Sequence, residues 1–104
     1  MKECMVLKAS AGTGKTYRLS LEYIASLLRG ESYRDILVMT FTKKATAEIK
    51  ERIIDFLEKI VKGEGEDIIE NILKLHEGLI IDKKKIEKIY KEISSNRDRV
   101  KIYT

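Results

Sequence analysis

The residues best suited to chemistry lie near the start of the chain, in the run Ala9-Ser10-Ala11-Gly12-Thr13-Gly14-Lys15-Thr16. Its two glycines let the backbone wrap closely around an anion with its N–H groups. Lys15 adds a positive charge, and the Thr16 hydroxyl can bind Mg²⁺. The spacing fits the phosphate-binding pattern G-x-x-x-x-G-K-[ST], with Ala9 in place of the first glycine. The run therefore predicts a P-loop that binds a nucleoside triphosphate, ATP in the first instance, with Mg²⁺.

The expected nucleotide contacts extend slightly beyond this run and comprise Ala11, Gly12, Thr13, Gly14, Lys15, Thr16 and Tyr17. The N–H groups of about Gly12 to Thr16 are expected to face the β-phosphate, reinforced by the positive end of the following helix. Lys15 and Thr16 are the candidate catalytic residues, with Thr16 also the metal ligand. Turnover further requires an acidic residue after a second strand and usually an arginine. Because Asp35 precedes its strand and no acidic residue follows one, we expect the chain alone to bind nucleotide without hydrolysing it.

Apolar runs and helical periodicities predict the elements that position this loop. The expected order is strand 4–7, helix 14–28, strand 35–41, helices 43–60, 66–77 and 82–93, and strand 100–103. Gly30 is expected to end the first helix, Gly63 the second and Gly78 the third, while Thr42 and Asp82 are expected N-caps. The pattern predicts an α/β fold, with a P-loop NTPase-like partial parallel sheet of about three strands and flanking helices.

Composition narrows the class of protein. The 104 residues suffice for one small domain, and the 43% hydrophobic and 37% charged residues argue against disorder. A net charge of +4 permits a nucleic-acid partner. The single cysteine excludes a disulfide framework, and no apolar stretch is long enough for a signal peptide or a membrane span. We therefore expect a cytoplasmic protein without a membrane partner.

A second segment, ILVMTFTKKATAEIKERI at residues 36–53, is informative when it is considered together with the P-loop. The pair resembles superfamily 1 DNA helicases of the UvrD/Rep/RecB type. The form ASAGTGKT resembles the P-loop of the RecB and AddA (exonuclease V) branch, and residues 36–53 are similar to motif Ia, usually close to I-L-V-x-T-F-T-N-K-A-A-x-E-M-K-x-R-I. The resemblance covers roughly the first sixty residues closely.

This resemblance implies an ATP-dependent DNA helicase or helicase–nuclease of DNA repair or recombination, in which a second subunit is a possible partner. The chain is then expected to be one N-terminal fragment of an incomplete RecA-like domain. Its parts are a strand, P-loop, helix, strand and helix over 1–62, a helical segment over 63–99, and the start of a further strand over 100–104. Motif Ia implies single-stranded DNA binding by Thr40, Phe41, Thr42 and Lys43, with Phe41 against a base.

Several alternatives remain open on the residues alone. Phe41 is alternatively a buried residue at a strand end, and Lys43 an ordinary solvated helix start. Tyr17 stands where related helicases place a side chain against adenine, but its helical spacing fits the core equally well. His76 has no partner cluster in the sequence and is expected to be structural. For the whole chain, the alternatives are a free-standing, non-catalytic nucleotide-binding module and a small P-loop kinase.

Overall fold

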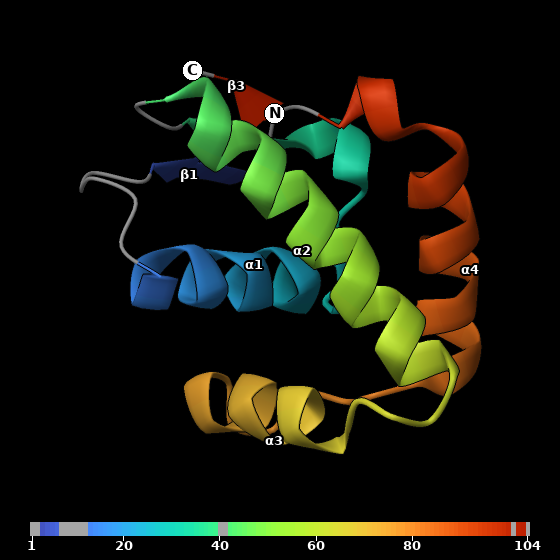
Figure 1. Cartoon of the computed structure of the whole chain (residues 1–104). Helices are drawn as coiled ribbons and strands as arrows, with labels where there is room; N and C mark the ends of the chain where they lie inside the picture. The colour runs from blue at the N-terminus through green and yellow to red at the C-terminus, as the bar shows by residue number, and fades with distance from the viewer. Residues whose placement is uncertain (1–2, 7–12, 40–41, 101, 104) are drawn as a thin grey trace.

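The computed structural model describes residues 3–6, 13–39, 42–100 and 102–103, with side chains described for residues 17–39, 42–100 and 102. In chain order, its strands and α-helices are β1 (Glu3–Val6), α1 (Thr13–Leu28), β2 (Ile36–Met39), α2 (Lys43–Val61), α3 (Glu66–Leu75), α4 (Lys83–Ser95) and β3 (Ile102–Tyr103) (Figure 1). Single 3₁₀ turns, Tyr33–Asp35 and Arg97–Arg99, precede β2 and β3.

The expected α/β class is wrong, because the described chain is mostly helical. The helices are 16, 19, 10 and 13 residues long, whereas the strands have four, four and two residues. The strands pair in parallel in the order β1–β2–β3, but they form only a small patch on one side of α1, at the top of Figure 1. The physical reason is that the apolar helix faces pack mainly against other helices, with α2 against both α1 and α4.

Helix α1 forms the centre of the molecule. It lies between the strands and α3, while α2 crosses it and α4 closes one side (Figure 1). Every residue from Ser20 to Leu28 except Glu22 is buried, including both serines, Ser20 and Ser26. A helix buried on nearly all sides is held by several neighbours at once. The part of α1 that follows its first turn is therefore enclosed by the other helices and the strands.

The expected helix ends are largely confirmed, because local chemistry sets them. Gly30 follows α1 with a φ of +107°, and its N–H donates to the Leu27 carbonyl at 3.1 Å. This is the glycine-terminated end that the sequence predicts. Thr42 caps α2 by accepting from the Ala45 N–H at 3.0 Å, and Asp82 caps α4. Helix α3 ends at Leu75, two residues before the predicted end.

Candidate nucleotide and DNA site

Two strand-to-helix junctions lie side by side at one edge of the paired strands. β1 and β2 are parallel neighbours, and their last residues, Val6 and Met39, are register partners. β1 leads through residues 7–12 into α1, and β2 leads through 40–42 into α2. Figure 1 shows the starts of α1 and α2 on the same side of the strands. The two segments singled out in the sequence therefore leave the strands from neighbouring points.

The predicted nucleotide contacts are described only in part. The first turn of α1 contains the backbone of Thr13, Gly14, Lys15 and Thr16. Ala11 and Gly12 lie outside the described residues, as do Thr40 and Phe41 of the predicted DNA contacts. The first turn of α1 contains no acidic residue, so no carboxylate of that turn opposes an anion there. The N–H groups of a helix start have no partners within the helix and suit phosphate oxygens.

The two described DNA candidates lie at the start of α2. Thr42 and Lys43 are exposed, and so is the neighbouring Lys44. Thr42 serves the helix itself, since its Oγ1 accepts from the Ala45 N–H and its carbonyl accepts from the Thr46 N–H at 3.1 Å. The first turn of α2 contains no acidic residue. Because lysines at a helix start oppose the helix dipole, an anion at this end is electrostatically favourable.

Tyr17 has its visible contacts on the core side. Its ring meets the Phe56 ring edge-on, with centroids 5.3 Å apart and an interplanar angle of 71°. Its hydroxyl accepts a hydrogen bond from Asn71 Nδ2 at 2.7 Å. The side chain is half-buried, so the core contacts expected from its helical spacing are present. The alternative contact with a nucleotide base remains a prediction.

A shallow hollow of about 570 Å³ adjoins this tyrosine between α1 and α2. Tyr17 and Phe56 contribute aromatic surface, and the remaining lining is Glu48, Glu51, Arg52 and Asp55. Three carboxylates against one guanidinium make the hollow unsuited to phosphate. The sequence analysis missed these acids, although their spacing of three and four residues places them on one helix face.

His76 has a structural partner that the sequence analysis did not find. Its Nε2 lies 2.9 Å from Glu22 Oε2, and its Nδ1 lies 3.5 Å from Arg29 Nη1. The imidazole therefore links the end of α3 to α1, in line with the expected structural role. Glu22 is 54 residues away in sequence, so no local pattern could have revealed the pair.

The described residues lack two further kinds of feature. No group of three or more histidine, cysteine, aspartate or glutamate side chains within them could hold a metal ion. No helix within them has both the length and the apolar character that a membrane crossing requires.

Comparison with known proteins identifies a family and several longer relatives. The chain matches the family described as the UvrD/REP helicase N-terminal domain over residues 1–102. It is 49% identical to the RecBCD enzyme subunit RecB of Chlamydia muridarum over 55 residues, which are 51% of this chain. It is 40% identical to RecB of Haemophilus influenzae over 72 residues, with 58% of this chain covered. It is 33% identical to an ATP-dependent helicase/nuclease subunit from Streptococcus agalactiae over 69 residues, with 66% covered.

The relatives are far longer than the matched segment. The matches span 5% of the Chlamydia muridarum protein, 6% of the Haemophilus influenzae protein and 6% of the Streptococcus agalactiae protein. No solved structure matches the chain.

Proposed function

Because this chain belongs to the UvrD/REP helicase N-terminal domain family, we propose that it binds Mg-ATP at residues 9–16 and single-stranded DNA at residues 40–43. The observation that carries the proposal is the pairing of Val6 with Met39, which brings the two strand-to-helix junctions to one edge. A motor that couples nucleotide to DNA needs the two ligands close together. Neighbouring parallel strands followed by helices supply such an arrangement.

Within the nucleotide site, each residue has one proposed task. The N–H groups of Gly12 to Thr16 hold the phosphates, and the Lys15 ammonium neutralises charge on the β- and γ-phosphates. The Thr16 hydroxyl binds Mg²⁺, which bridges phosphate oxygens and offsets their charge. The first turn of α1 fits this assignment because it adds unpaired N–H donors and no carboxylate.

Within the DNA site, Phe41 offers an aromatic face that accepts any base, as a motor independent of sequence requires. Thr40, Thr42 and Lys43 are assigned to contacts with the DNA backbone or the base edges. Lys43 stands where the family often has asparagine, so we assign it charge attraction to phosphate and no specific hydrogen bond. In a longer protein related to RecB or AddA, this pair of sites would form part of an ATP-dependent helicase or helicase–nuclease.

The proposal is tested by titrating Mg-ATP into the 104-residue chain by calorimetry, beside Lys15→Ala. Loss of a charged contact to phosphate is expected to weaken binding by about 10- to 150-fold. Lys62→Ala is the matched control, because it removes the same charge at the far end of α2, where Lys62 pairs with Glu58 at 3.0 Å. Its affinity should equal that of the wild type. Absence of binding to the folded wild type, or an unchanged Lys15→Ala, would contradict the proposal.

A further inference from the structure

Helix α3 reaches the start of the P-loop helix through one hydrogen bond. Asn71 Nδ2 donates to the Tyr17 hydroxyl at 2.7 Å, and the two residues are 54 positions apart. Tyr17 directly follows Thr16, the last residue of the proposed phosphate cradle. A contact at Tyr17 therefore acts within one residue of the atoms that are expected to meet the nucleotide.

The two partners of Tyr17, Asn71 and Phe56, belong to helices that are packed into the core. Next to Asn71, Ile72 is fully buried, and Ile68 one turn earlier is 4% exposed, so α3 is packed into the core. On the other side, Phe56 of α2 is 7% exposed and meets the Tyr17 ring edge-on. Tyr17 is thus held at its ring by α2 and at its hydroxyl by α3.

This double hold constrains the rotation of the first turn of α1. A tyrosine has only two side-chain torsions between its backbone and its ring, so fixing ring and hydroxyl restricts the backbone that carries them. Phosphate binding by backbone N–H groups depends on donors placed within roughly half an ångström of their working positions. Support from a neighbouring element is the usual way in which such placement is maintained.

We propose that Asn71 is a positioning residue for nucleotide binding. Acting through the Tyr17 hydroxyl, it holds the first turn of α1 in the orientation in which Gly14, Lys15 and Thr16 receive phosphate. Tyr17 itself then contributes by anchoring the loop, and the base is left without an aromatic partner at this position. The inference rests on the proposed nucleotide site and adds α3 to it.

The existing contacts of Tyr17 favour anchoring over stacking on a base. To lie flat on a base, the Tyr17 ring would have to leave its edge-on contact with Phe56 and its hydrogen bond to Asn71. Both contacts are kept if the tyrosine anchors the loop.

The test compares Mg-ATP with Mg-tripolyphosphate, which has the phosphates but no base. Calorimetry on Asn71→Ala, Tyr17→Phe and the double variant measures the affinity for each probe. If Tyr17 and Asn71 position the loop, each single variant should lose about three- to tenfold in affinity, equally for both probes. The double variant should lose no more than one single variant, because both changes remove the same hydrogen bond.

Asn96→Ala is the matched control. Asn96 Nδ2 also donates one hydrogen bond, to the Glu92 carbonyl at 2.8 Å, but this bond lies at the end of α4. Thermal unfolding of all variants shows which remain folded. Because Tyr17→Phe keeps the ring contact with Phe56, it tests the inference even if Asn71→Ala fails to fold.

The outcomes separate the inference from the function on which it rests. Weaker binding of Mg-ATP alone would show that the Tyr17–Asn71 pair acts on the base and not on the phosphate loop. Unchanged affinities with a lower melting temperature would show a role in stability only. Either result overturns the inference while the nucleotide site stands. If the folded wild type binds neither probe, the proposed function fails and the inference fails with it.

Discussion

At the scale of single residues, Tyr23 shows that enclosing α1 among its neighbours buries a polar hydroxyl. It lies in the middle of α1 and is fully buried. Its hydroxyl has no hydrogen-bond partner among the described residues. Burial, together with the nearby Tyr33, raises the pKa of the Tyr23 hydroxyl well above its ordinary value. A buried hydroxyl without a partner destabilises the folded state relative to an apolar group of the same shape.

We therefore predict that Tyr23→Phe is stabilising by about 1 kcal/mol in urea unfolding at neutral pH. The folded pKa lies above the unfolded value of about 10, so this group leaves stability intact below about pH 10 and lowers it as the pH rises further. The variant should lose less stability than the wild type at alkaline pH. Tyr90→Phe, at a half-buried position, is the control for removal of one hydroxyl. A clearly destabilised Tyr23→Phe would show that the hydroxyl is bonded after all.

The sequence could indicate the type of the site residues but not their neighbours. Gly12, Gly14, Lys15 and Thr16 are recognisable because a phosphate loop needs them at consecutive, fixed positions. The contacts of Tyr17 are different in kind. Its partner Asn71 lies on a helix 54 residues later. Neither segment alone contains a pattern that predicts this hydrogen bond.

At the scale of elements, the turn between α2 and α3 depends on the absence of one side chain. A Cβ on Gly65 would lie 2.7 Å from Ile60 Cγ1 and 3.0 Å from the Ile60 backbone nitrogen. The backbone atoms of Ile60 cannot move away from such a Cβ as easily as the end of a flexible side chain could. A larger residue at this point would therefore force α3 and α2 to shift apart.

Gly65→Ala is accordingly predicted to lower the free energy of unfolding by about 1–3 kcal/mol, as overpacking typically does. Chemical unfolding measures the change. Glu64→Ala, at the exposed position next to it, should stay within about 0.5 kcal/mol of the wild type. Equal stability of Gly65→Ala and wild type would show that the two helices can separate at little cost.

Helices were easier to predict than strands for a physical reason. Gly30, Thr42 and Asp82 end or start helices through bonds within a few residues, so their effects are visible locally. The strand expected over 35–41 begins at Ile36 in the structure, because Asp35 belongs to a 3₁₀ turn capped by Ser32. Its expected last residues, 40–41, lie outside the described residues. The fold class failed for a related reason. The apolar faces of the four helices pack against one another, and local periodicity does not predict which faces will be partners.

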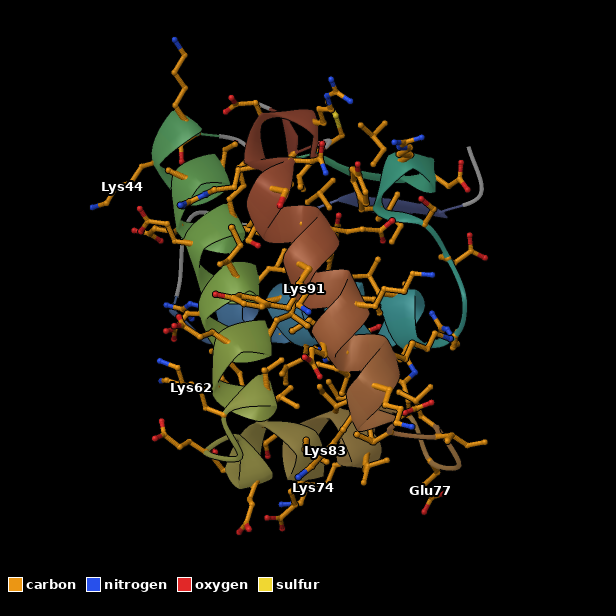
Figure 2. The ribbon with its side chains drawn as sticks, turned by 90° about the vertical axis from the view of Figure 1, so that its right-hand side faces the viewer. Lys44, Lys62, Lys74, Glu77, Lys83 and Lys91 are labelled. Carbon is orange, nitrogen blue, oxygen red and sulfur yellow. The ribbon has the colours of Figure 1, made fainter. Side chains whose placement is uncertain are left out.

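At the scale of the whole molecule, the arrangement of charge favours anions at the start of α2. Along the helices, lysines pair with acids four residues away, as in Lys59 with Asp55 at 3.3 Å and Lys62 with Glu58 at 3.0 Å. Figure 2 shows Lys44 extending from the body at the start of α2, apart from Lys62, Lys74, Lys83 and Lys91. Because the first turn of α2 has no acidic residue, positive charge there is not offset within that turn.

We propose that nucleotide phosphates bind at Gly12 to Thr16 and single-stranded DNA at Thr40 to Lys43. The most direct measurement maps backbone amide chemical shifts of the 104-residue chain, first with Mg-ATP and then with a short oligothymidylate. Mg-ATP is predicted to shift the amides of residues 12–16 most, and the oligothymidylate those of residues 40–43. Largest changes elsewhere, such as around the acidic turn at Glu64 to Asp67, or a folded chain whose amides do not respond, would contradict this account.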